Sequence, residues 1–166
     1  MSVELSPIIA GVMNWGVWDK NLNTNEFTHL INLFIENGIT TFDHADIYGG
    51  YTTEASFGKA LSGSKIDRKK IQLITKCGIQ YISENRPNNS IKHYEYSKDY
   101  IIWSAENSLK NLQTDYLDVF LLHRPSPLMQ ADEIAEAVSK LKADGKILSF
   151  GVSNFTPFQT ELLRQK

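Results

Sequence analysis

Apolar positions along this chain follow two spacings in turn. Short apolar runs of the length of buried strands recur, and between them apolar residues fall three and four positions apart, as on one face of a helix. The pattern predicts strands at 7–13, 39–43, 71–76, 116–122 and 147–152. It predicts helices from Asn23, at 53–61, from Ser97, at 131–143 and from Pro157.

Cap and stop residues support these helices. Asn23 with Glu26 three positions later resembles a capping box, and Gly38 is a suitable stop for that helix. Pro157 stands where the first turn of a helix accepts proline. The polar stretch 78–96 is predicted to be a long loop, and the charge run 67–70 a solvated one.

The spacing of the predicted strands indicates the fold class. The strands begin near residues 8, 39, 71, 116 and 147, so most units are a little over thirty residues long. Alternating strands and helices predict a parallel α/β fold, and eight such units would make a (β/α)8 TIM barrel of about 250 residues. We therefore predict one partial barrel domain over residues 1–166, truncated to about the first five βα units, with strands six to eight absent. An open five-stranded sheet is the alternative.

A dinucleotide-binding open sheet is disfavoured by the first turn. Its sequence is Gly11-Val12-Met13-Asn14-Trp15-Gly16. It lacks the Gly-x-Gly-x-x-Gly that brings backbone close to a pyrophosphate.

Composition and charge narrow the class of protein. The chain is 42% hydrophobic and 22% charged, with a net charge of −2, which gives no broad reason to bind nucleic acid or anionic membrane. It has no apolar run long enough for a membrane span and no signal-peptide pattern at its N-terminus. The single cysteine, Cys77, excludes an internal disulfide and is predicted to be a buried thiol. We expect a cytoplasmic protein.

Polar, chemically capable residues end the apolar runs. Asp43, Lys76 and His123 each end one, and Ser153 and Asn154 end the last. Because parallel strands open onto one edge with their carboxyl ends, these side chains should meet there, as in an active site.

Tyr48 adds an acid to this group. It follows Asp43 by five positions, in the loop beyond the strand end. A phenol donates a proton more readily when a nearby cation stabilises the phenolate, and Lys76 is the candidate cation, held in place by Asp43. His123 could orient a carbonyl oxygen or relay a proton.

Each residue also has an ordinary interpretation. Asp43 could cap the next segment, Lys76 could be a solvated strand end, and His123 a hydrogen-bonded core histidine. Ser153-Asn154 could cap the helix at Pro157, and Tyr48 could be a turn aromatic. The occurrence of all these residues together favours an active site. Metal binding is not predicted, because His44, Asp46 and His123 give too few ligands at recognisable spacing.

Four short segments carry a combined signal across nearly the whole chain. They are Phe42-Asp43-x4-Tyr48-Gly49, Ile74-Thr75-Lys76, Asp118-Val119-Phe120-Leu121-Leu122-His123-Arg124-Pro125 and Gly151-Val152-Ser153-Asn154-Phe155. Taken together and in this order, they resemble the aldo-keto reductase family of NADP-dependent carbonyl reductases.

The resemblance implies roles for named residues and a reaction. Hydride passes from NADPH to an aldehyde or ketone carbon, and Tyr48 protonates the oxygen. The implied catalytic tetrad is Asp43, Tyr48, Lys76 and His123. The implied cofactor contacts are Gly11, Met13, Asn14, Ser153 and Asn154, the last two at the nicotinamide carboxamide. The implied substrate-pocket walls are Trp15, Trp18 and Tyr51.

The resemblance also sets expectations for the chain by itself. The family's remaining cofactor contacts come from strands six to eight, beyond Lys166. We therefore expect this chain alone to bind NADPH weakly or not at all and to tend to associate. The partner implied for the reductase is a small carbonyl substrate, and the implied assembly is a monomer or weak homo-oligomer. Two other functions stay open. One is a non-catalytic binding or regulatory subunit on the same fold, and the other is a Schiff-base aldolase that uses Lys76.

Overall fold

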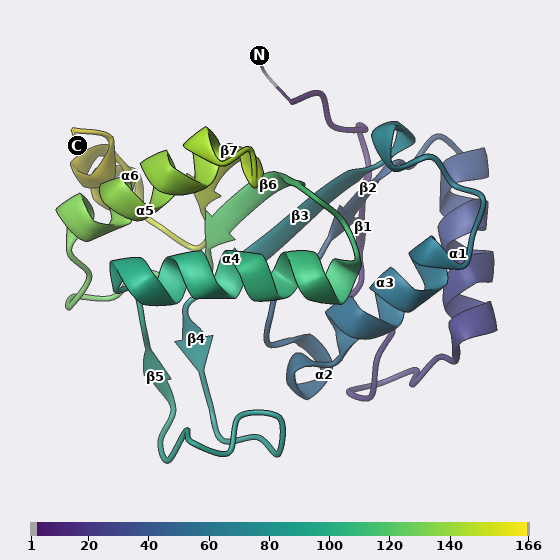
Figure 1. Cartoon of the computed structure of the whole chain (residues 1–166), viewed down its shortest axis with the longest axis horizontal. Helices are drawn as coiled ribbons and strands as arrows, with labels where there is room; N and C mark the ends of the chain where they lie inside the picture. Colours follow the sequence, from purple (N-terminus) through teal and green to yellow (C-terminus); the bar gives the residue numbers. More distant parts are fainter. Residues whose placement is uncertain (1–2, 166) are drawn as a thin grey trace.

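Five parallel strands form the sheet around which the chain is built (Figure 1). The computed structural model describes residues 3–165. The strand order is β1-β2-β3-β6-β7, so each unit adds its strand beside the previous one. The bounds are β1 Ile9–Gly11, β2 Thr41–Asp43, β3 Gln72–Cys77, β6 Leu117–Leu122 and β7 Ile147–Val152.

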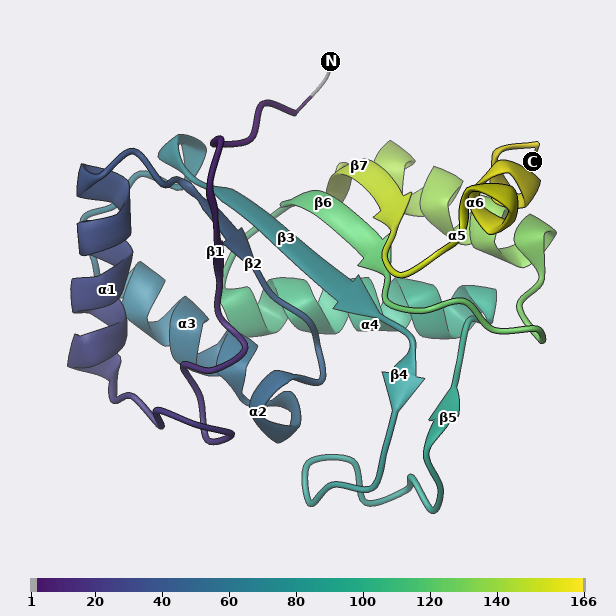
Figure 2. The same cartoon turned by 180° about the vertical axis from the view of Figure 1, so that it is seen from behind.

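Helices cover one face of this sheet. The long helices are α1 Thr24–Glu36, α3 Thr53–Ser62, α4 Lys98–Leu112, α5 Ala131–Ala143 and α6 Pro157–Arg164. In Figure 1 α4 lies in front of the strands, and in Figure 2, from behind, the strands lie in front of α3 and α4. Two short turns complete the set, α2 Tyr48–Tyr51 and the 3-10 helix η1 Arg68–Lys70.

Local capping explains where several helices begin. The oxygen of the Asn23 side chain accepts hydrogen bonds from the backbone of Asn25 and Glu26, and Glu26 accepts one from the backbone of Asn23. This is the capping box that the sequence predicts for α1. A second box, between Thr156 and Gln159, begins α6.

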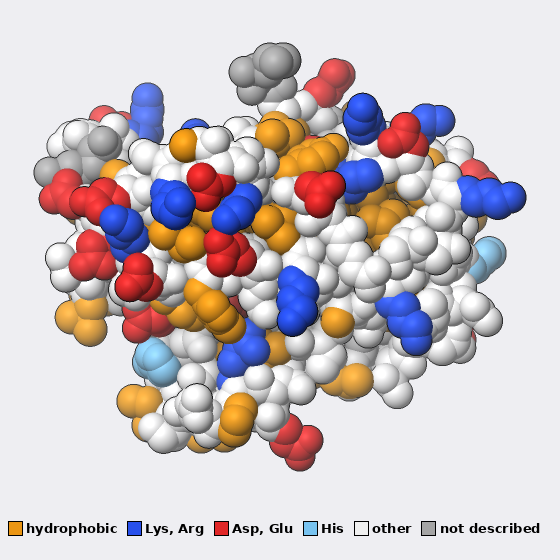
Figure 3. Space-filling view, in the orientation of Figure 1, with side chains coloured by type: hydrophobic (Ala, Val, Ile, Leu, Met, Phe, Trp, Pro, Cys, Tyr) orange, Lys and Arg blue, Asp and Glu red, His pale blue; other side chains and the backbone are white. Residues whose placement is uncertain are grey.

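The core lies between the sheet and the helices. Phe27, Phe42, Phe57 and Phe120 are fully buried there, and Trp15 joins them. Burial of large aromatic side chains contributes most of the packing energy of such a layer. The surface of the helical face carries acidic and basic side chains intermixed over α5, in keeping with a net charge near zero (Figure 3).

Most predicted elements are confirmed, and the exceptions are local. Helix α5 and strand β7 have the predicted bounds, whereas β1 is shorter than predicted. The predicted loop 78–96 is wrong at its base, where β4 Ile79–Gln80 and β5 His93–Tyr94 pair antiparallel. Strands of two residues are too short to leave a periodic pattern. The hairpin projects at the carboxyl end of the sheet, beside α2 (Figure 2).

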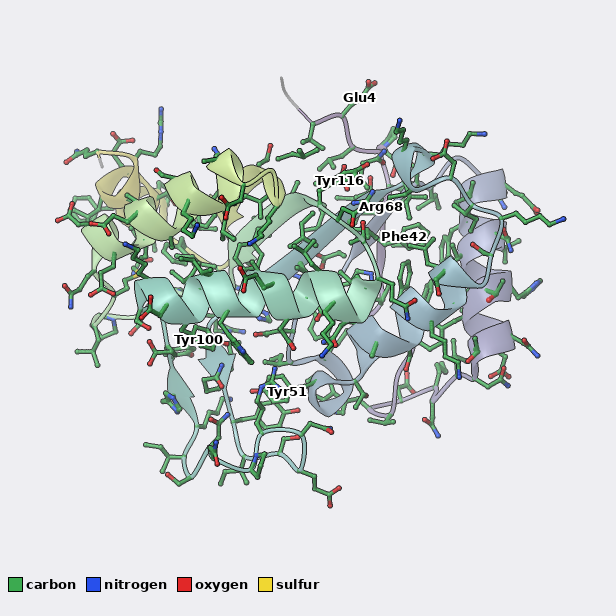
Figure 4. The ribbon with its side chains drawn as sticks, in the orientation of Figure 1. Glu4, Phe42, Tyr51, Arg68, Tyr100 and Tyr116 are labelled. Atoms are coloured by element: carbon green, nitrogen blue, oxygen red, sulfur yellow. The ribbon has the colours of Figure 1, made fainter. Side chains whose placement is uncertain are left out.

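The solvated interpretation of the charge run 67–70 is wrong for one residue. The guanidinium of Arg68 donates to Asp118 at 2.7 Å, to the backbone oxygens of Ile71 and Tyr116, and lies 4.1 Å above the Tyr116 ring (Figure 4). Asp118 in turn accepts from the backbone of Leu73. Arg68 therefore joins η1 to β3 and β6, while its neighbours in the run stay exposed.

The sheet is open at both ends. Strands β1 and β7 each have one neighbour, so within residues 3–165 nothing pairs with their outer edges. Apolar side chains on these two strands, Ile9 and Leu148, are 43% and 48% exposed. The described residues therefore leave two unpaired sheet edges with exposed apolar surface.

Candidate active site

The carboxyl ends of β2 and β3 bring a carboxylate and an ammonium together. Lys76 Nζ lies 2.8 Å from both side-chain oxygens of Asp43 and 2.7 Å from the backbone oxygen of His44. Lys76 is only 6% exposed. A buried ammonium needs a paired charge and several acceptors, and this arrangement supplies both.

Tyr48 lies directly over this pair. Lys76 Nζ donates to the Tyr48 hydroxyl at 3.3 Å, and the Tyr48 side chain is buried in α2. The lysine therefore contacts Asp43 on one side and the phenol on the other. The structure brings together three of the four residues of the predicted tetrad by direct hydrogen bonds.

The turn that holds Tyr48 needs glycine. Gly49 and Gly50 have φ of 59° and 67°, in the left-handed region that favours glycine. A Cβ on Gly49 would also lie 2.5 Å from the hydroxyl of Thr53. Tyr51 has φ of 72° and keeps this strained conformation because its hydroxyl donates to Ile79 and its ring stacks on Tyr81.

His123 completes the group from β6. Its backbone N–H donates to Cys77, and its ring centroid lies 6.2 Å from that of Tyr48, nearly perpendicular to it. Burial, with smaller contributions from Lys76 and Arg124, lowers the pKa of His123 to about 4. The imidazole is therefore neutral near pH 7 and suits hydrogen bonding better than proton donation.

Ser153 and Asn154 lie beside His123, at the end of β7. The Asn154 amide donates to the backbone oxygen of His123 and to the Ser153 hydroxyl, both at 2.9 Å. Asn154 has φ of 61°, which fixes the turn. The oxygen of its side chain has no protein partner among the described residues and can accept from a ligand. An amide and a hydroxyl in this place fit a carboxamide such as that of nicotinamide.

The predicted cofactor contacts at the end of β1 lie beside open space or in the turn that follows. A Cβ on Gly11 would meet nothing within 4 Å, so space is open beside the strand. Met13 is 44% exposed and faces the same pocket as Tyr48. Asn14 lies in the following turn, where its backbone oxygen accepts from Lys20.

Of the three predicted pocket walls, Trp18 is the one that faces the site. Trp18 is 46% exposed and lies edge-on to Tyr48 at 6.1 Å. Trp15 is instead in the core, stacked on Phe34, because the space beside it is filled by phenylalanine rings. Tyr51 is buried under the β4–β5 loop (Figure 4).

A pocket of about 530 Å³ lies above Tyr48 and His123. Its wall includes five residues that the sequence did not indicate, namely Ile47, Ile79, Tyr81, Lys92 and Arg124. Arg124 could have been found from its place next to His123. Lys92 could not, since it lies in a polar loop without a distinguishing pattern.

Two buried carboxyl groups lie on the helical side of the sheet, away from this pocket. Asp46 accepts from Tyr100 and Ser104 of α4, and Glu54 accepts from Thr75 at 2.6 Å. Burial, and then the neighbouring Glu54, raise the pKa of Asp46 to about 8. Burial likewise raises the pKa of Glu54. No sequence pattern indicates this cluster.

Asp46→Asn is expected to stabilise the fold at alkaline pH and to lose this advantage in acid. The carboxyl binds its proton more tightly folded than unfolded, so the wild type loses stability as pH rises from about 4 to about 8. Asparagine does not titrate. Between pH 5 and pH 8, the free energy of unfolding of the variant, measured in urea, should rise by at least about 2 kcal/mol relative to that of the wild type. The exposed Asp115→Asn is the control, and parallel pH curves for Asp46→Asn would contradict the assignment.

Arg86 fastens the β4–β5 loop to the site. Its guanidinium lies between the rings of Tyr51 and Trp103, 4.5 and 4.8 Å from their centroids. The side chains of Ser83 and Asn85 donate to the backbone oxygen of Gly50. The first half of the loop is therefore tied to the turn that carries Tyr48.

Residues 3–165 hold no cluster of three His, Cys, Asp or Glu side chains suited to bind a metal ion. The helices in this range are each too short or too polar to cross a lipid bilayer.

Comparison with known families gives one consistent match. A profile of the "Aldo/keto reductase family" matches residues 7–166. The uncharacterized oxidoreductase YcsN of Bacillus subtilis is 48% identical over 97% of this chain and 53% of its own length. The oxidoreductase YdhF of Escherichia coli is 46% identical over 98% of this chain and 53% of its own length.

A solved structure gives the same answer for the fold. The glycerol dehydrogenase of Gluconobacter oxydans superposes with a TM-score of 0.84 at 28% identity, covering 99% of this chain and 50% of that one. The chain spans about half the length of the curated relatives it matches. The sheet described here is thus the first part of a (β/α)8 barrel, as predicted.

Proposed function

The chain belongs to the aldo/keto reductase family, whose members in general use nicotinamide cofactors, and on that premise we propose a carbonyl reductase. The reaction is reduction of an aldehyde or ketone with NADPH, and Tyr48 is the general acid. The chain spans about half of its relatives, so the proposal concerns the reductase to which these residues contribute.

One observation carries the proposal. Lys76 Nζ donates hydrogen bonds to both side-chain oxygens of Asp43 and to the Tyr48 hydroxyl. Tyr48 in turn lines an open pocket. A phenol that must release a proton needs a fixed cation at its oxygen, and structural packing alone does not require one there.

Tyr48 donates its proton to the carbonyl oxygen in this mechanism. The ammonium of Lys76, 3.3 Å away, stabilises the negative charge that develops on the phenol oxygen. Asp43 holds that ammonium in position. When bound, NADPH supplies the hydride that the carbonyl carbon accepts, so the product is the alcohol.

His123 positions the substrate in this proposal. The neutral imidazole faces the pocket beside Tyr48 and can hydrogen-bond the carbonyl oxygen. Its lowered pKa supports Tyr48 rather than His123 as the proton donor at neutral pH.

The cofactor would be held at the end of the sheet. Ser153 and Asn154 would bind the nicotinamide carboxamide, and Gly11, Met13 and Asn14 would line its approach. The open space at Gly11 and the free amide oxygen of Asn154 support these assignments. The choice of NADPH over NADH comes from the family resemblance.

The aldolase alternative has less support. A Schiff base needs a neutral, accessible amine. Lys76 is 6% exposed and its ammonium already donates to Asp43, His44 and Tyr48. Borohydride trapping should therefore yield no adduct on Lys76.

Turnover separates the reductase from the non-catalytic subunit. We expect purified protein to oxidise NADPH only when an aldehyde or ketone is present, with one alcohol formed per NADPH. The measurement is the loss of reduced-nicotinamide absorbance against a panel of carbonyls, with product identified by mass. Absence of carbonyl-dependent oxidation across the panel would favour the regulatory subunit.

The cellular compartment and the oligomeric state of the protein are part of the same proposal. We place it in the cytoplasm, where the buried thiol of Cys77 stays reduced, as a monomer or weak homo-oligomer that acts on small molecules.

A further inference from the structure

Two basic side chains stand unpaired in the wall of the pocket above Tyr48. Lys92 comes from the β4–β5 loop, and Arg124 directly follows His123. Both are exposed. Within the described residues neither side chain has a carboxylate in ion-pair range, whereas Lys76 beneath them is paired with Asp43.

The rest of the pocket wall has no negative charge that would neutralise these two cations. Its other residues are apolar or aromatic apart from the hydroxyls of Tyr48 and Tyr81 and the neutral His123, and no acidic side chain of the described chain lines it. The pocket therefore carries net positive charge over an apolar floor. Such a wall attracts an anionic ligand.

The backbone of Arg124 is held in place. The hydroxyl of Tyr96 accepts from its N–H at 3.2 Å and donates to its oxygen. The charge of Arg124 contributes to the lowered pKa of His123, so its field reaches the reacting end of the pocket.

Lys92 also lies on anchored structure. Asn89 donates to Gln80 at 2.9 Å and to the backbone of Tyr81 at 3.2 Å, and the same loop is clamped at Arg86. Both cations are thus presented to the pocket by fixed segments.

We propose that this pocket takes carbonyl compounds that carry an anionic group, a carboxylate or a phosphate. Arg124 and Lys92 bind the anion while the carbonyl oxygen lies at Tyr48 and His123. The placing of the carbonyl rests on the proposed reductase function. Binding of the anion does not depend on turnover.

The phosphate of a nicotinamide cofactor is the other possible anion. Ser153 and Asn154, which would hold the nicotinamide, do not line this pocket. The observations therefore favour the substrate as the source of the charge.

The test compares two aldehydes that differ in one charge, 4-formylbenzoate and its methyl ester. Binding to this chain is followed by the indole N–H resonance of Trp18, which lies against Tyr48 and is assigned by its loss in Trp18→Phe. We expect the carboxylate to bind at least about tenfold more tightly at low salt, and the preference to shrink as salt is added.

Arg124→Met and Lys92→Met should each weaken binding of the carboxylate about fivefold, the range of an exposed ion pair. Binding of the ester should not change. Lys110→Met, an exposed lysine on α4, should bind both aldehydes as the wild type does.

Three results would overturn the inference. The first is equal affinity for the acid and the ester, and the second is a preference for the acid that survives in the Arg124→Met, Lys92→Met double variant. The third is that the variants lose the preference for nicotinamide mononucleotide over nicotinamide riboside but keep the preference for 4-formylbenzoate over its ester. A charge preference in this chain, with no NADPH oxidation by the reductase to which these residues contribute, would refute the reductase and leave the anion site standing.

Discussion

Tyr48→Phe is expected to lower kcat for carbonyl reduction at least about a hundredfold, the range lost with a general acid. The substitution removes the hydroxyl that Lys76 contacts at 3.3 Å and keeps the ring that packs against Trp18 and faces His123. Because the ring stays, KM should change little, so the loss appears in both kcat and kcat/KM. Steady-state NADPH oxidation with a reactive aldehyde measures it.

Tyr94→Phe is the matched control for this prediction. Tyr94 lies in β5 and does not line the pocket above Tyr48, so its variant should keep the wild-type kcat. An unchanged kcat in Tyr48→Phe would rule out the phenol as the acid. A large rise in KM alone would mean that Tyr48 only binds substrate.

Arg68→Met is expected to reduce the free energy of unfolding by about 3 kcal/mol. The change removes one partner of a buried ion pair, since the side chains of Arg68 and Asp118 are 18% and 8% exposed, and leaves the carboxylate with the backbone N–H of Leu73. Breaking such a pair costs about 3–5 kcal/mol because an uncompensated charge stays buried. Urea unfolding followed by circular dichroism gives the difference.

Lys69→Met offers a control one residue away. Lys69 is exposed, and a surface substitution of this kind should change stability by no more than about 0.5 kcal/mol. If the two variants unfold at the same urea concentration, Arg68 contributes no more than the solvated charge that its sequence context suggests.

The contrast between Arg68 and its neighbours shows where sequence reasoning stops. A run of four charged residues predicts a solvated surface, and for Lys69 and Lys70 that holds. Arg68 departs from it because its partners, Thr114 and Asp118, are more than forty residues away in sequence. A local pattern carries no information about such contacts.

The elements themselves could be predicted because their signals are local. Hydrophobic periodicity and capping residues predicted α1, α5 and β7, because those signals lie within one helix or strand. The β4–β5 pair and the turn α2 were missed. Their conformation depends on pairing with distant residues and on positive φ at Gly49 and Gly50.

The candidate site was predictable where strand ends define it. Asp43 and Lys76 meet because parallel strands open onto one edge, and Tyr48 follows from the same motif. Trp15 was assigned to the pocket through the family resemblance. It lies instead in the core, where it is 7% exposed and stacked on Phe34.

Arg86 separates two parts of the β4–β5 loop above the pocket. Residues before it are bound to the turn of Tyr48, whereas 90–92 are exposed and carry the cation Lys92. In the proposed reductase, replacement of 90–92 would therefore alter which molecules bind without altering how they react. Substrate selectivity could then be changed by evolution or by a designer while Asp43, Tyr48 and Lys76 stay the same.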